Sequence, residues 1–227
     1  MNNLERAFRY PFSGQDWQSR FAVGGFLCVL ASVLGFIPVI GVVLWVVVTF
    51  LPLGYAYRIL RCQLEGAGGP PPRWQEWGNL FSRGWYVFLV TLGYGIVPAI
   101  LYWLGKALWF TGGVWAFLGV LFIILGLGIG LVAFFLLPMA LAFFVQENES
   151  FSAAFGWSGI VERIWMVQGE YFKGWLACLI LFLALSFVRF SFLYVGWIIY
   201  AVGIFYLTLV AANLFGSLPR AGAEVKR

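Results

Sequence analysis

Long apolar stretches without a charged residue alternate with short polar segments along this chain. The first stretch, Phe21 to Tyr57, has 37 residues, and one helix of that length would reach about 55 Å, too long for a single membrane crossing. Pro38 and Gly41 supply a break, so the pattern predicts two short helices joined by a tight turn. A re-entrant hairpin that enters and leaves on one side is the alternative.

Four further apolar stretches are each long enough for a membrane-spanning helix. The pattern therefore predicts an all-α integral membrane protein, a single polytopic domain over 1–227 with six transmembrane helices in three hairpins. Pro98 is expected to kink the third helix, and the long fourth one is tilted, protrudes from the membrane or bends at Pro138. The expected spans are 21–37, 41–57, 85–104, 114–145, 174–192 and 195–216.

An aromatic and polar segment precedes each odd-numbered span, and two of these segments end in similar strings, FSRGW at 81–85 and YFKGW at 171–175. We expect three units, each a cytoplasmic interfacial amphipathic segment followed by a helical hairpin. Chance similarity between apolar segments of low complexity is the alternative. Four aromatic residues of the middle segment share one helical face, as in a helix that lies in the membrane interface: Trp74, Trp77, Phe81 and Trp85.

Composition supports a chain that is embedded in lipid. Hydrophobic residues make up 63% of the chain and charged residues 10%, with a mean hydropathy of +0.93. A soluble domain carries about 25% charged residues, so this chain has too few to cover a surface that faces water. Residues 1–20 are polar and aromatic, unlike a cleaved signal peptide, and are expected to belong to the mature protein.

The basic residues predict the orientation, because cytoplasmic loops carry an excess of lysine and arginine. Of 14 basic residues, only Lys106 and Arg189 fall on the predicted outer side. We therefore expect a multi-pass protein of the cell inner (plasma) membrane with both termini in the cytoplasm. The other basic residues are Arg6, Arg9, Arg20, Arg58, Arg61, Arg73, Arg83, Arg163, Lys173, Arg220, Lys226 and Arg227. They form no tract of five or six, so no nucleic-acid partner is expected.

Several sequence blocks resemble a known family. They are YPFSGQDW at 10–17, LGYAYRILRCQLEG at 53–66, PPRWQEWGNLFSRGW at 71–85, FVQENESFSAAF at 144–155 and GEYFKGW at 169–175. The chain resembles the bacterial and archaeal membrane family known as domain of unknown function 4013, DUF4013. Gly54 and Tyr55 match its Gly-Tyr at the end of the second span, and Pro72, Trp74 and Trp77 match its Pro-x-Trp-x-x-Trp segment. The resemblance implies a polytopic helical fold and brings no activity.

Several chemistries are excluded by the residues. The chain has no histidine, which removes Ser-His-Asp and Cys-His catalysis and the commonest metal ligand. Cys28, Cys62 and Cys178 are scattered, without the spacing of a zinc site or a disulfide framework. Gly126 and Gly130 lie within an apolar run at the spacing that lets two membrane helices pack closely. The expectation is no enzyme, no cofactor and no metal.

Few charged side chains remain for function. Arg189, about 22 Å along a helix that begins near Gly174, is expected to snorkel to the outer headgroups or to bind a lipid phosphate or a partner carboxylate. A basic loop over 58–84 and an acidic segment over 146–173 are predicted on the same side of the membrane. These two segments either pair with each other or remain solvated.

Two classes of function are favoured, and an intramembrane enzyme is the weakest alternative because the usual sets of nucleophile and base are missing. The first is a non-catalytic scaffold, lipid-interacting protein or small subunit of a membrane complex, with the lipid bilayer and other membrane-protein subunits as partners. Its candidate contacts with lipid or partner are Arg189, Trp74, Trp77, Phe81 and Trp85. The second is a permease or channel component for an uncharged or lipid-like solute, because helices interrupted at prolines can line a pathway.

Overall fold

The protein is built from helices alone over the part described by this computed structural model, residues 3–224. For residues 193, 194 and 219–224 the structure describes the backbone only. The long helices are α2 (Trp17–Leu34), α3 (Ile40–Glu65), α4 (Trp77–Trp109), α5 (Gly113–Gln146), α8 (Gln168–Ser191) and α9 (Leu193–Glu224). The short ones are α1 (Asn3–Arg9), the 3-10 turn η1 (Tyr10–Phe12), α6 (Phe151–Ala154) and α7 (Trp157–Met166).

The six long helices are long and apolar enough to cross a membrane, which confirms the predicted number. Helices suit this environment because each satisfies its own backbone hydrogen bonds without water. Pro38 lies in the turn between α2 and α3, where a residue without an N–H is tolerated. The break starts earlier than expected, because α2 ends at Leu34. By contrast, Pro52, Pro98 and Pro138 all lie inside continuous helices.

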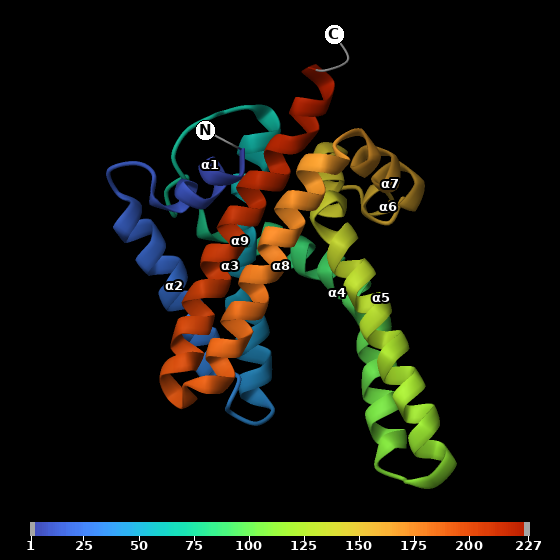
Figure 1. Cartoon of the computed structure of the whole chain (residues 1–227). Coiled ribbons are helices and arrows are strands. Elements are labelled where there is room, and N and C mark those ends of the chain that lie inside the picture. The colour runs from blue at the N-terminus through green and yellow to red at the C-terminus, as the bar shows by residue number, and fades with distance from the viewer. Residues whose placement is uncertain (1–2, 225–227) are drawn as a thin grey trace.

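The six helices form two arms that meet at one end of the molecule and separate toward the other (Figure 1). One arm, the four-helix arm, contains α2, α3, α8 and α9, which pack against one another. The other, the hairpin arm, is α4 packed along α5. Helices next to each other in the chain are thus neighbours in space. We call the space between the separating arms the wedge.

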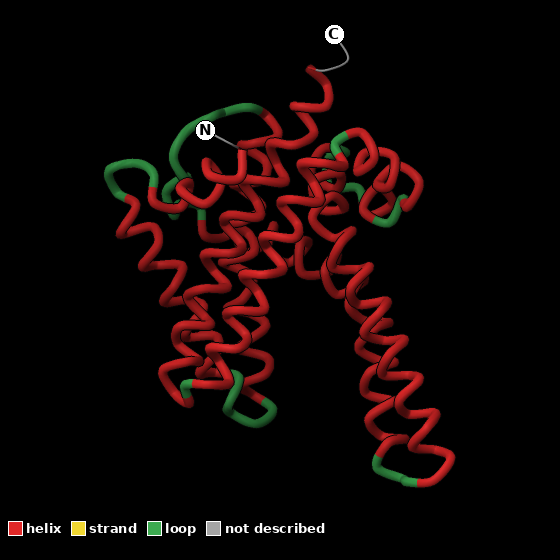
Figure 2. Tube along the Cα trace, viewed as in Figure 1, coloured by secondary structure: helices red, strands yellow, loops and turns green. Residues whose placement is uncertain are grey.

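The two ends of the molecule differ in charge. The first and last described residues and the segments before α2, α4 and α8 lie at the end where the arms meet (Figures 1 and 2). Every acidic residue whose side chain is described belongs to these segments or to the adjoining helix ends, so we call this the charged end. The opposite, apolar end holds the turns 35–39 and 110–112 and the α8–α9 junction, with Lys106 and Arg189 as its basic residues. Lys226 and Arg227 lie outside the described residues.

Large buried aromatic side chains join the helices of both arms. Tyr55 of α3, Phe144 of α5, Tyr171 of α8 and Phe205 of α9 are all less than 2% exposed. The Tyr171 hydroxyl donates a hydrogen bond to the Phe135 carbonyl of α5. These buried contacts near the charged end join the two arms there. The rest of α4 and α5 does not pack against the four-helix arm in this way.

Glycines allow α4 and α5 to cross closely. A Cβ atom added at Gly119 would lie 2.6 Å from the Gly105 carbonyl oxygen, so α5 and α4 touch through their backbones at this point. A Cβ atom at Gly126 would lie 3.0 Å from the Pro98 carbonyl oxygen, whereas one at Gly130 would make an ordinary contact with Pro98 at 3.4 Å. Close approach of this kind needs small residues, and the pair Gly105 and Gly119 was not apparent from the sequence.

The segment before α4 differs from its prediction. Residues 66–76 are mostly irregular, and α4 begins only at Trp77. The prediction of one helical face from Trp74 to Trp85 is therefore wrong at its first residue. The prolines at 70–72 lack N–H donors and disfavour a helix. Short helices do precede α2 and α8, and the placement of these segments in the membrane interface stays a prediction.

Candidate functional site

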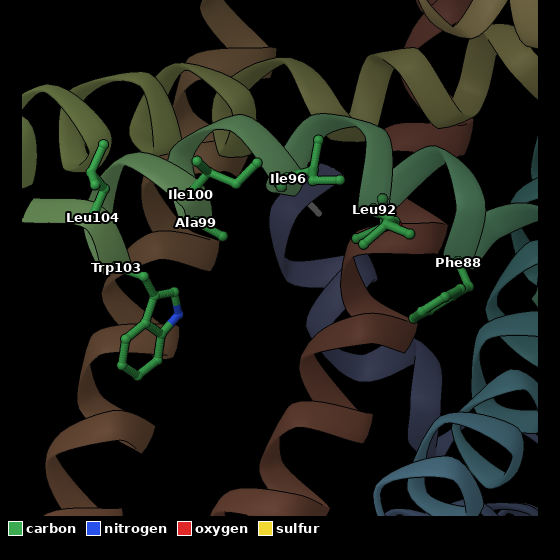
Figure 3. A pocket seen from close by; sticks show the side chains of 9 residues that line it. Phe88, Leu92, Ile96, Ala99, Ile100, Trp103 and Leu104 are labelled. Atoms are coloured by element: carbon green, nitrogen blue, oxygen red, sulfur yellow. The ribbon is translucent and has the colours of Figure 1, made fainter. Parts of the chain in front are cut away.

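An apolar groove runs along one face of α4 (Figure 3). Its volume is about 700 Å³. It is lined by Phe88, Thr91, Leu92, Gly95, Ile96, Ala99, Ile100, Trp103 and Leu104. The hydroxyl of Thr91 donates to the Val87 carbonyl of its own helix at 2.8 Å. The groove therefore presents hydrocarbon to a ligand and little that forms hydrogen bonds.

The end of this groove that is nearer the charged end of the molecule coincides with the point where α3 and α4 separate. The ring of Phe88, the first lining residue, lies 5.3 Å from the ring of Phe50 on α3. On α3, Val47 and Val43 precede Phe50 by three and seven residues and so share its face. They are 38% and 60% exposed. Beyond Phe50 and Phe88, both helices thus leave apolar side chains exposed.

The other end of the groove lies beside a cation. Lys106 follows the last lining residue, Leu104, by two positions, and its Nζ lies 5.2 Å from the Trp103 ring centroid and 5.8 Å from that of Tyr102. Among the described side chains, no carboxylate lies within ion-pair distance of Lys106. Cation–π contact orients an ammonium group without neutralising its charge. The groove is thus apolar along its length and positive at one end.

Arg189, the second cation of the apolar end, lies in the last turn of α8. Its guanidinium carbon lies 3.7 Å from the ring centroid of Trp197 and 4.9 Å from that of Tyr200, both on α9. The side chain thus lies over aromatic rings of α9. Lys106 and Arg189 are on different arms of the molecule.

The four aromatic residues expected on one face have two different environments. Trp74 is stacked on Tyr55, with ring centroids 4.1 Å apart and planes at 6°, and its Nε1 donates to the Arg20 carbonyl at 2.8 Å. Trp77, Phe81 and Trp85 follow on α4 and remain partly exposed. The structure thus makes Trp74 a packing residue that secures the loop 66–76, and leaves the other three at the surface.

The basic loop and the acidic segment pair with each other at the charged end. Arg83 of α4 forms an ion pair with Glu149, which follows α5. The hydroxyl of Tyr57 on α3 donates to the other carboxylate oxygen of Glu149 at 2.5 Å. A cavity of about 250 Å³ adjoins this contact, between the end of α3 and the end of α5. The pairing alternative is therefore the observed one.

The described residues contain no group of three or more His, Cys, Asp or Glu that is placed to hold a metal ion. The arrangement that the structure does provide is an apolar groove with a cation at its end. Such a surface matches an amphiphile with an anionic head.

Comparison with known proteins gives one match. No curated protein and no solved structure is similar enough to the chain to match it. The family described as protein of unknown function, DUF4013, matches residues 33–194. This range covers more than half of the chain and four of the five blocks that carried the resemblance. The chain therefore belongs to the DUF4013 family.

Proposed function

We propose that this protein is a non-catalytic lipid-binding protein of the inner membrane, with its charged end in the cytoplasm. A phospholipid chain lies in the α4 groove and the anionic headgroup meets Lys106. The observation that carries this proposal is the continuity of the groove, which runs from Phe88 to Leu104 and ends beside a cation that has no carboxylate partner among the described side chains.

The length of the groove suits an acyl chain. From Phe88 to Trp103 the helix rises by about 22 Å, and one leaflet of the hydrocarbon core is about 15 Å thick, half of the roughly 30 Å total. A lipid whose phosphate lies near Lys106 thus finds apolar side chains along its whole acyl length.

Selectivity has to come from the headgroup. Inside a bilayer, an acyl chain gains little by moving from the surrounding lipid tails into the groove, because both surroundings are equally apolar. An ion pair between Lys106 and a phosphate distinguishes anionic from zwitterionic lipids, since the positive charge of a zwitterionic headgroup weakens the attraction. The proposal therefore predicts a preference for anionic lipid that depends on Lys106.

The permease alternative has less support in the structure than the lipid-binding proposal. It relied on helices interrupted at prolines, and Pro52, Pro98 and Pro138 do not interrupt α3, α4 or α5. A subunit of a larger complex would place a partner helix in the wedge in the position that we assign to lipid, so the test has to separate these two occupants.

The test is native mass spectrometry of the full chain, purified in mild detergent with mixed phosphatidylglycerol and phosphatidylcholine. We expect phosphatidylglycerol to remain bound to the wild type and several-fold less to Lys106→Gln. Lys173→Gln is the matched control, because Lys173 pairs with Glu170 at 3.2 Å at the charged end.

A second pair of variants tests the groove. Ile96→Trp fills it, whereas Ile124→Trp enlarges a side chain of α5 that is exposed and does not line the groove. Lipid retention should fall in the first variant only. Equal retention in wild type, Lys106→Gln and Ile96→Trp would overturn the proposal. A stoichiometric protein partner that excludes lipid from the groove would replace it with the subunit function.

A further inference from the structure

Arg189 is packed closely against the first turn of α9 at the α8–α9 junction. α8 ends at Ser191 and α9 follows almost directly, with the Gly196 N–H donating to the Phe192 carbonyl. A Cβ atom at Gly196 would lie 3.1 Å from the Arg189 carbonyl oxygen and 3.2 Å from its Cα. This glycine therefore lets the first turn of α9 lie directly against Arg189.

Aromatic rings from two further elements complete this setting. Trp197 and Tyr200, on consecutive turns of α9, both lie under the guanidinium. The ring of Phe36, from the turn between α2 and α3, lies 5.0 Å from that of Trp197. Trp197 is thus contacted by Phe36 as well as by Arg189. Stacking of this kind orients the guanidinium plane and leaves N–H groups at its edge free of the rings.

The positive charge of Arg189 has no counter-charge within the described part of the chain. It takes part in none of the ion pairs there, and its Nε is buried without a hydrogen-bond partner. A guanidinium without a counter-charge is costly at this end of the molecule, so an external anion that meets its other N–H groups would stabilise this arrangement.

We propose that Arg189, seated on Trp197 and Tyr200, binds a phosphate group. A guanidinium donates two parallel N–H groups, which match two oxygens of a phosphate. The described acidic side chains all lie at the charged end, so none of them is a carboxylate partner for Arg189 at the apolar end. The phosphate belongs to the headgroup of a lipid or to a free phosphate ester.

This site stands apart from the α4 groove. Arg189 belongs to the four-helix arm and Lys106 to the hairpin arm, so either site can bind or fail to bind without the other. Variants at the two positions therefore separate this inference from the proposed function.

The test measures the affinity of the full chain for phosphatidylglycerol in nanodiscs and in detergent, with Arg189→Gln and Arg189→Lys as variants. Arg189→Gln should raise the dissociation constant of one phosphatidylglycerol site about tenfold. Arg189→Lys keeps the charge but loses the paired N–H groups, so an intermediate rise is expected. Arg9→Gln is the control, since Arg9 is exposed and pairs with Glu5 at 3.0 Å.

Competition with inorganic phosphate distinguishes the two sources of the phosphate group, a lipid headgroup and a free phosphate ester. Displacement of the lipid by phosphate at millimolar concentration identifies a site for phosphate groups in general, and its absence identifies a lipid headgroup site. Each result supports the proposal. An unchanged affinity in Arg189→Gln overturns it, as does an equal loss in Arg9→Gln. The Arg189→Lys variant keeps the test valid if Arg189→Gln fails to fold, because an affinity equal to that of the wild type again overturns the proposal.

Discussion

The hydroxyl of Tyr57 donates a hydrogen bond of 2.5 Å to the carboxylate of Glu149, and this contact links α3 to the turn after α5. Arg83 of α4 pairs with the same carboxylate and lies 5.7 Å from the Tyr57 ring centroid. Three helices from both arms thus meet at one carboxylate, at the end where the arms join. Glu149 has a backbone φ of 65°, in the left-handed region that non-glycine residues rarely adopt, so its position depends on these partners.

Replacement of Glu149 should loosen the junction between the arms. Glu149→Gln removes the charge that neutralises Arg83, and the side chains of the pair are only 19% and 31% exposed. We expect the free energy of unfolding to fall by about 1–2 kcal/mol, measured by denaturation with sodium dodecyl sulfate in mixed micelles. Glu147→Gln is the control, since Glu147 is half exposed and 3.9 Å from Arg163. Equal losses in the two variants would contradict a specific role for Glu149.

The crossing of α4 and α5 should tolerate no methyl group at its centre. Gly119→Ala places a Cβ atom 2.6 Å from the Gly105 carbonyl oxygen, and overpacking of this kind costs about 1–3 kcal/mol. Gly128→Ala in the same helix meets nothing within 4 Å and should be neutral or slightly stabilising, because alanine favours helix over glycine. Thermal unfolding of the two variants in detergent checks this prediction. A similar melting temperature for both would show that the helices do not approach this closely.

The loop 66–76 should be released when Trp74 loses its hydrogen bond. Trp74→Phe keeps a ring on Tyr55 but removes the Nε1 donor to the Arg20 carbonyl, a loss of about 1 kcal/mol. We expect faster cleavage by trypsin at Arg73 in detergent. The comparison is Trp77→Phe, because Trp77 is about half exposed and donates none of the hydrogen bonds found among the described residues. Cleavage at the wild-type rate in Trp74→Phe would show that other contacts hold the loop.

The orientation of the protein can be tested with single cysteines after Cys28, Cys62 and Cys178 have been replaced by alanine. A membrane-impermeant maleimide should label Thr111→Cys in intact cells, and Gly68→Cys only after permeabilisation, because the charged end is expected in the cytoplasm. Both sites are exposed. The reverse pattern would place the termini outside.

The same experiment separates the two readings of residues 21–57. Ile37 lies in the exposed turn between α2 and α3. If this stretch spans the membrane twice, Ile37→Cys is labelled in intact cells at a rate close to that of Thr111→Cys. If it is a re-entrant hairpin, the turn stays within the bilayer and Ile37→Cys is not labelled from outside.

The pattern of apolar residues was sufficient to predict the six long helices and the break near Pro38. The reason is physical: a chain in hydrocarbon has to satisfy its backbone hydrogen bonds internally, and a proline in a turn costs less than one in a helix. The segregation of charge to one end followed in the same way from the order of spans and loops. Pairing of the basic loop with the acidic segment, observed between Arg83 and Glu149, was one of two alternatives, because sequence alone does not say which loops on one side touch.

Tertiary structure decided the rest. Trp74 left the predicted helical face because Tyr55 and Arg20, distant in sequence, provide its partners. The division into two arms was not predictable, because a helix that is apolar on every side shows no preference between packing on another helix and facing lipid. Which helices pack together depends on the shapes of their side chains, and the hydrophobic pattern does not contain that information. That packing sets three features: Gly105 opposite Gly119, the α4 groove in the wedge, and Arg189 on Trp197.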